Sequence, residues 1–166
     1  MKTSFIIVAD RGNLKAFRVE AAGGERQPRL ALVQSLSFTE AHTKISEVNT
    51  DMAGRFPAGS TLSTTGAGAG GGGGRHQAAI AETQQALETD RRIIKQIAEH
   101  VATILHKERP RSWGFAAPAA INSAVLERLD APLRKSMSEN HSVDLVNMDP
   151  AKLAGHFTIV AHAGVV

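Results

Sequence analysis

The chain has 166 residues, a mass of 17.6 kDa and a formal net charge of +3, with 42% hydrophobic and 21% charged residues. This size and composition are typical of one globular domain, so we expect residues 1–166 to form a single domain. They exclude a disordered chain, and no apolar run approaches the ~20 residues that span a bilayer. The absence of cysteine excludes disulfides and thiolate chemistry and is compatible with a cytoplasmic protein.

The first forty residues predict three antiparallel strands. Residues 3–9 form an almost continuous apolar run with β-branched residues, which is typical of a strand covered on both faces. A turn signal at 10–13 leads into the alternating residues 14–20, so these two segments predict a hairpin. Residues 30–38 alternate again, and we expect Leu30, Leu32, Leu36 and Phe38 to share one face.

Residues 39–77 show no helical or strand periodicity and are rich in Thr, Ser, Gly and Ala. We therefore expect a long Gly-rich loop at about 39–78, either functional or disordered. Within it, residues 51–56 combine an acid, a turn glycine, a cation and two apolar side chains. This island is either a local turn whose Phe56 fills the core or a binding surface that includes Arg55.

The loop ends in a glycine run that leads directly into a helical pattern. Glycine loses the most backbone entropy on ordering, so the run is either a hinge, a place of close backbone approach or an ordinary disordered loop. The first functional groups after it would sit at a helix start, where unpaired N–H groups favour contact with phosphate or an ester. The hinge residues are Gly70, Gly71, Gly72, Gly73 and Gly74, followed by Arg75, His76 and Gln77.

Heptad spacing of apolar residues predicts one long helix at about 79–107. The apolar stripe is thin in the first half and becomes broad only over residues 93–105. We therefore expect residues 93–105 to pack on the sheet and the N-terminal turns to project from the body. Arg91, Arg92 and Lys95 lie near the middle of this helix and are expected, with Arg75, to bind phosphate.

The last third of the chain predicts alternating strands and helices. We expect a strand at 113–117, a helix beginning at Pro118, a short helix at 130–137 and a last core strand at 142–147. Asp149 is expected to cap a helix that runs to about residue 156.

The final residues, 157–166, fit either a helical extension or an added strand. The complete pattern predicts an α/β fold with a mixed sheet in the order β-β-β-α-β-α-β-α, which is a ribonuclease-H-like arrangement.

Four local motifs carry a resemblance to a known family. They are Ile-Val-Ala-Asp-Arg-Gly at 7–12 with Phe17 after the first strand, Asp-Met-Ala-Gly-Arg-Phe at 51–56, the glycine run before a long charged helix, and Gly-Phe-Ala-Ala-Pro at 114–118. With the element order, these motifs resemble the bacterial host attachment proteins, described as required for attachment to host cells. That family is similar to the central domain of archaeo-eukaryotic class I peptide chain release factors.

The release-factor domain carries a Gly-Gly-Gln motif at the tip of a long helix, and this motif promotes hydrolysis of the peptidyl-tRNA ester. The matching segment here is 73–77, in which Arg75 and His76 separate the glycines from Gln77. The resemblance implies a partner such as tRNA or the ribosome, with ester hydrolysis or ribosome rescue as the reaction. Gln77 would then be the catalytic residue that orients the attacking water. The alternative is a non-catalytic protein-interaction module that affects attachment indirectly.

Other functional motifs are weak. The pattern Gly-x-Gly-x-x-Gly at 68–73 lies far from the preceding strand, which argues against a dinucleotide site. The seven histidines have no helical i, i+4 pair and no cysteine partners, so we expect no metal and no cofactor. Asp10 ends the first strand where ribonuclease-H-like nucleases place a metal-binding carboxylate, but a turn-capping role is the favoured interpretation.

Overall fold

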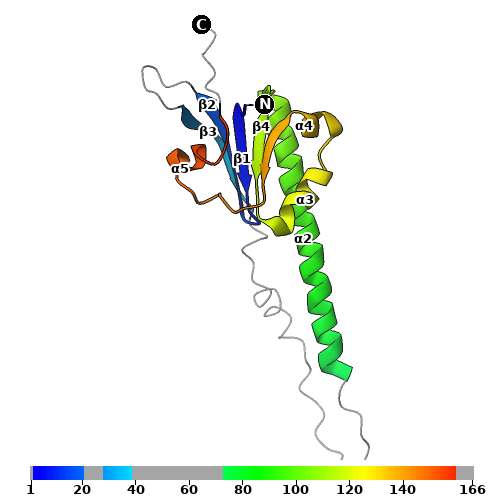
Figure 1. Cartoon of the computed structure of the whole chain (residues 1–166). Coiled ribbons are helices and arrows are strands. Elements are labelled where there is room, and N and C mark those ends of the chain that lie inside the picture. The colour runs from blue at the N-terminus through cyan, green and yellow to red at the C-terminus, as the bar shows by residue number, and fades with distance from the viewer. Residues whose placement is uncertain (1, 21–27, 39–72, 160–166) are drawn as a thin grey trace, which may run out of the picture.

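The computed structural model describes residues 2–20, 28–38 and 73–159, without the side chains of residues 73–82. These residues form a five-stranded sheet in the order β3-β2-β1-β4-β5 (Figure 1). The strands are β1 (Phe5–Ala9), β2 (Asn13–Glu20), β3 (Arg29–Ser37), β4 (Trp113–Ala116) and β5 (Met137–His141).

The sheet is mixed, as the sequence predicts. Strand β2 pairs antiparallel with both β1 and β3, whereas β1, β4 and β5 run parallel to one another. Since parallel strands end at the same edge of a sheet, the turn after Ala9 and the segment after Ala116 lie at one edge. We call this the carboxyl edge.

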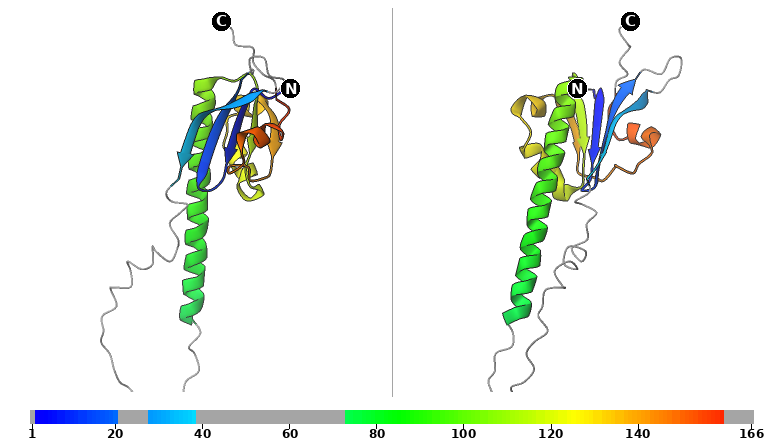
Figure 2. Two further views of the ribbon diagram at one scale, coloured as in Figure 1. Left: turned by 90° about the vertical axis from the view of Figure 1, so that its left-hand side faces the viewer. Right: turned by 180° about the vertical axis from the view of Figure 1, so that it is seen from behind.

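Helices cover both faces of the sheet. Helices α2 (Gly73–Glu108), α3 (Ala119–Glu127) and α4 (Ala131–Lys135) lie on one side, and α5 (Pro150–Ala154) lies on the other (Figures 1 and 2). The connections between the parallel strands run over one face of the sheet: α2 precedes β4, and α3 and α4 lie between β4 and β5. The last segment, which contains α5, returns over the opposite face.

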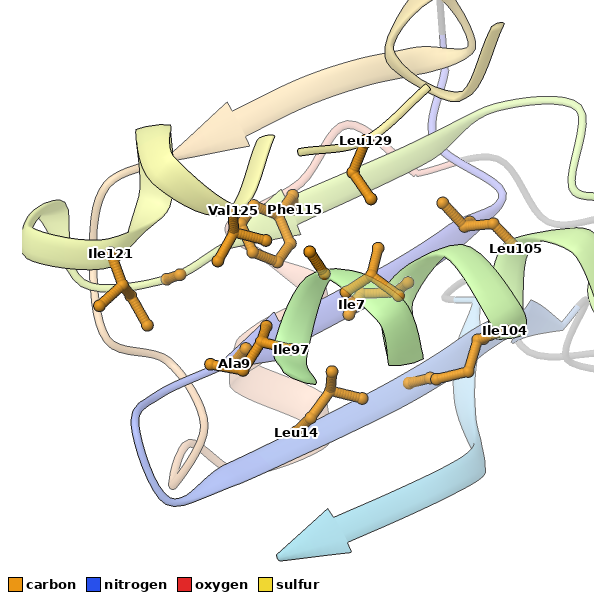
Figure 3. Packing of buried hydrophobic residues seen from close by; sticks show 14 of the residues in the cluster. Ile7, Ala9, Leu14, Ile97, Ile104, Leu105, Phe115, Ile121, Val125 and Leu129 are labelled. Atoms are coloured by element: carbon orange, nitrogen blue, oxygen red, sulfur yellow. The ribbon is translucent and has the colours of Figure 1, made fainter. Parts of the chain in front are cut away.

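Strand β1 is the centre of both hydrophobic clusters. All five of its residues are buried, and alternate residues contact different clusters. Ile7 and its neighbours at positions 5 and 9 contact helices α2 and α3 (Figure 3), whereas Ile6 and Val8 contact Leu145, Val146 and the C-terminal layer. The prediction of a strand covered on both faces is confirmed, because only an apolar residue at every position can satisfy two dry faces.

The leucines of β3 do not share one face, so that prediction is wrong. Leu36 packs with the cluster under α2, whereas Leu30 packs with the cluster on the opposite face. The cause is a register shift opposite Ala16 and Phe17 that leaves Val33 as an extra residue in β3. Since side chains alternate with a period of two, one extra residue reverses the face of everything beyond it.

The prediction of a last core strand at 142–147 is also wrong. The fifth strand is the polar segment Met137–His141, which pairs with β4 at the edge of the sheet. Leu145 and Val146 are buried, but they lie in an irregular segment that covers the second face. Their apolar character therefore signals burial rather than strand pairing. Helix α4 accordingly ends at Lys135, before the strand begins.

The C-terminal segment follows its predicted cap. The side chain of Asp149 accepts a hydrogen bond from the backbone N–H of Ala151 at 2.8 Å, which starts α5. The helix ends at Ala154, slightly before the expected boundary. Phe157 is buried, and Ile159 forms a parallel bridge with Thr3. The described part of this segment therefore lies beside the sheet, and residues 160–166 lie outside the described residues.

Candidate functional site

Helix α2 has two distinct halves. In the anchored segment (residues 93–108), Ile93, Ile97, Val101 and Ile104 are buried on the sheet. In the projecting segment (residues 73–89), the described side chains from residue 83 onward are exposed or half-buried, and Leu87 is 53% exposed. Figures 1 and 2 show this segment extending beyond the carboxyl edge. The predicted division of the helix is therefore confirmed, since the apolar stripe becomes broad only where the sheet lies beneath it.

The helix begins at Gly73 rather than near residue 79. Gly73 and Gly74 thus lie in its first turn and not in a preceding loop. Once the anchored segment has formed, adding a turn requires no new nucleation, so a helix can extend past the point where packing ends. Alanines at 78 and 79 favour this extension, although each glycine opposes it by about 1 kcal/mol.

The expected tip residues Arg75, His76 and Gln77 lie in the first two turns of α2. The first four N–H groups of a helix have no acceptor within it, which here applies to residues 73–76. The first turn contains no acidic residue, so no carboxylate there offsets the positive end of the helix dipole. The structure thus places this trio at the far end of a projecting helix.

The turn after β1 braces the helix where it leaves the sheet. Asp10 Oδ1 accepts hydrogen bonds from the backbone N–H groups of Gly12 and Asn13, both at 2.6 Å. This confirms Asp10 as a turn cap. The turn carries Arg11, whose guanidinium donates to Asp90 on α2 at 2.9 Å. We call this ion pair the brace.

The cations of α2 are distributed along the helix rather than gathered at one point. Arg91 and Arg92 are exposed beside the brace, and neither makes an ion pair with a described residue. Lys95 is exposed in the anchored segment and pairs with Glu99 at 3.8 Å. Arg75 and Arg91 are about 24 Å apart along the axis, at ~1.5 Å per residue. The sequence-predicted residues therefore form a line of contacts, not a closed pocket.

Several sequence-predicted residues belong to the part of the chain that the structure does not describe. Arg55, the surrounding island at 51–56 and the glycines Gly70, Gly71 and Gly72 lie outside the described residues. Among the residues that are described, no group of three acidic, histidine or cysteine side chains could hold a metal ion. None of the described helices is long and apolar enough to cross a membrane.

Sequence reasoning missed two long-range pairs near the carboxyl edge. One is the brace between Arg11 and Asp90. The other joins Asn122 of α3 to Asn140 of β5 by reciprocal amide hydrogen bonds of 2.9 and 2.8 Å. Asn122 is only 1% exposed, and it also donates to the carbonyl of His141 at 3.1 Å. The signal available in the sequence was Asn122, a polar residue that directly follows the apolar Ile121 on the predicted helix.

These features define an α/β protein whose mixed sheet anchors half of one long helix and lets the other half project. The chain belongs to the family described as "Protein required for attachment to host cells", whose sequence profile matches residues 5–157. The resemblance to host attachment proteins is thus confirmed over most of the chain. No curated protein matches the sequence.

Proposed function

We propose that this protein is a release-factor-like domain that acts at tRNA or the ribosome. The proposal draws on the observed order of elements, in which the antiparallel strands β1, β2 and β3 precede one long helix, and β4 and β5, which run parallel to β1, follow it. This order is compatible with the ribonuclease-H-like, release-factor central-domain class that the sequence motifs suggest. One domain over residues 1–166 and a cytoplasmic location are part of the same proposal.

The observation that carries the proposal is the projecting segment of α2. It extends beyond the sheet. Arg75 lies at its tip, and Arg91 and Arg92 follow its other end, beside the brace. Positions this far apart suit an extended polyanion better than a small ligand, because no small molecule can contact both. The acids at 82, 88 and 90 lie between them, so the phosphate contacts would be separate ones.

A hydrolytic role would belong to the tip. Water would attack the carbonyl carbon of the peptidyl ester, and the bond to the tRNA 3′ oxygen would break. Gln77 would orient that water, and the N–H groups of the first helical turn would stabilise the developing negative charge. Arg75 and His76 are larger than the glycines of a Gly-Gly-Gln sequence, and a larger tip fits a confined catalytic site less well. Binding to tRNA or the ribosome without hydrolysis is therefore the weaker form of the same proposal.

A non-catalytic protein-interaction module is the second candidate. Its support is Leu87, which is 53% exposed on the projecting segment and lies in register with the buried apolar stripe of the anchored segment. A partner helix could cover this stripe. Such a complex would resist salt, whereas binding through phosphates weakens steeply as salt rises.

Ribosome and tRNA co-sedimentation at low and raised salt tests the first candidate. The informative variant carries Arg91→Glu with Arg92→Glu, and the matched control carries Arg134→Glu with Lys135→Glu on α4, which are also adjacent and exposed. Both variants change the net charge equally. We expect salt-sensitive binding that only the α2 variant loses, whereas equal loss in both variants would reduce the interaction to non-specific charge.

The catalytic form has a separate test. Peptidyl-tRNA is incubated with the wild-type protein and with Gln77→Ala, and release of the peptide is measured. We expect release by the wild type and a loss of at least tenfold in the variant. Equal release by both proteins would remove Gln77 from the mechanism.

A further inference from the structure

A second cationic region lies at the opposite end of α2 from the projecting segment. There the carboxyl end of the helix, strand β2 and the chain before β4 surround a depression with a cavity volume of about 250 Å³. Arg18, Arg109 and Arg111 line it, together with one carboxylate, Glu108. Three guanidinium groups against one carboxylate leave two positive charges around a small cavity. We call this region the arginine pocket.

Two buried residues lie against the arginine pocket. Phe5 and Val19 line it and are 2% and 1% exposed. Ser4 connects the chain before β1 to two other segments around the pocket. Its hydroxyl donates to the carbonyl of Ser112, before β4, at 2.7 Å, and its carbonyl accepts a hydrogen bond from the N–H of Val19 in β2. Arg18, Arg109 and Arg111 are all solvent-exposed, so their guanidinium groups are accessible to an anion.

The guanidinium groups are not equally engaged. Arg18 pairs with Glu108 of α2 and is thereby held at the wall of the pocket. Arg109 donates through Nε to the carbonyl of His106 at 3.4 Å, a long contact. Arg111 is exposed and makes no ion pair with any described residue. Arg109 and Arg111 therefore remain available for an anion.

The backbone at Arg109 supports a role beyond ending the helix. Its φ of 44° is the one positive value among the described non-glycine residues, and glycine is the residue usually favoured there. The N–H of Arg109 closes the last turn onto Leu105 at 2.9 Å, and Pro110 then redirects the chain. This strained bend places Arg109 and Arg111 on one depression. Strain of this kind is commonly retained at binding sites.

We propose that the arginine pocket binds the phosphate of a small phosphorylated molecule. A phosphate monoester carries close to two negative charges at neutral pH, which matches the two uncompensated positive charges. The planar guanidinium fork fits phosphate oxygens in a bidentate manner, and Arg109 and Arg111 can supply two such forks. The size of the cavity fits a phosphate on a small body. This inference is independent of the action proposed at RNA, which concerns the other end of the helix.

Titration of the full chain with inorganic phosphate, followed by amide chemical shifts, tests this site. Ionic strength is held constant with chloride, and acetate and tRNA are titrated in parallel. We expect saturable shifts at the amides of residues 4–5, 18–19, 109 and 111–112, with weaker binding of acetate. Acetate binding as tight as phosphate, tRNA saturating these amides in the absence of phosphate shifts, or unsaturated shifts at all exposed cations would each overturn the proposal.

Variants separate binding from structure. Arg111→Ala is expected to lower phosphate affinity about tenfold, as expected for loss of a charged hydrogen bond, whereas the exposed control Arg134→Ala leaves it unchanged. Glu108→Gln is expected to raise affinity severalfold, because it removes the competing carboxylate. Arg109→Gly relieves the backbone strain, so the melting temperature should rise while phosphate affinity falls. Unchanged affinity in Arg109→Gly and Arg111→Ala would contradict the assignment.

Discussion

The two halves of α2 belong to one continuous helix of 36 residues but have different physical support. The anchored segment owes its stability to tertiary burial, since Ile97, Val101, Ile104 and Leu105 contact the sheet and α3 (Figure 3). None of the described side chains of the projecting segment, from residue 83 to residue 89, is buried on the sheet, so the support that burial gives the anchored segment is missing there. The comparison shows that a helix can form beyond the point where it is buried, and that tertiary burial stabilises only the anchored segment.

The largest predicted difference comes from truncating one apolar residue in each half. Ile97→Ala leaves a cavity among fully buried side chains and should lower the free energy of unfolding by about 2–5 kcal/mol. Leu87→Ala should change the free energy of unfolding by less than about 0.5 kcal/mol, because about half of the Leu87 surface is already exposed to solvent. Chemical denaturation of both variants measures the two values. Similar losses would show that Leu87 is covered in solution.

Loss of the buried Asn122 side chain should also lower the stability of the whole fold. Asn122→Ala removes the hydrogen bonds to Asn140 and to the carbonyl of His141, at an expected cost of about 1–3 kcal/mol. The neighbouring control, Ser123→Ala, is exposed and should be nearly neutral. Thermal unfolding of both proteins gives the comparison. Equal stability of the two variants would indicate that the Asn122–Asn140 pair does not hold α3 to β5.

Glycine substitutions distinguish local from global stability. Ala86→Gly in the projecting segment should cost about 1 kcal/mol of helix propensity. The loss should appear as lower helicity in circular dichroism, with little change in the melting temperature. Ala98→Gly, at a position 4% exposed, should lower the melting temperature itself. If both variants lowered the melting temperature equally, the two halves would unfold as one unit.

The brace should have the smallest effect. Arg11→Ala breaks a partly exposed ion pair with Asp90, so we expect a loss of at most about 1 kcal/mol. Its effect should be concentrated where the helix leaves the sheet, seen as faster hydrogen exchange at residues 87–92. The reversed pair, Arg11→Asp with Asp90→Arg, should restore slow exchange. Continued fast exchange in the reversed pair would mean that the brace acts through something other than its charges.

The fold was predictable wherever one local pattern determined the outcome. Three features could be predicted from only a few neighbouring residues each. They are the apolar run of β1, the helix cap at Asp149 and the broadening of the apolar stripe at Ile93. The predictions were wrong where the structure of a segment depends on pairing with a segment that is distant in the sequence. The extra Val33 in β3 depends on the register with β2, and the polar strand β5 exists because β4 offers it an edge.

The same division applies to the candidate site. The positions of Arg91 and Arg92 on an exposed helix followed from periodicity alone. The brace could not be predicted, because Arg11 and Asp90 are 79 positions apart in the sequence and meet only through the fold. The arginine pocket was missed for the same reason, since Arg18 and Arg111 come from segments that only the sheet brings together.

Native-state hydrogen exchange along α2 tests the central claim most directly. Amides of residues 97–105 should exchange only through global unfolding, because burial on the sheet holds them. Amides of residues 77–87 should exchange faster by several orders of magnitude, since only local helix opening is required. Uniformly slow exchange from residue 77 to residue 105 would contradict a helix that is anchored in one half and projects in the other.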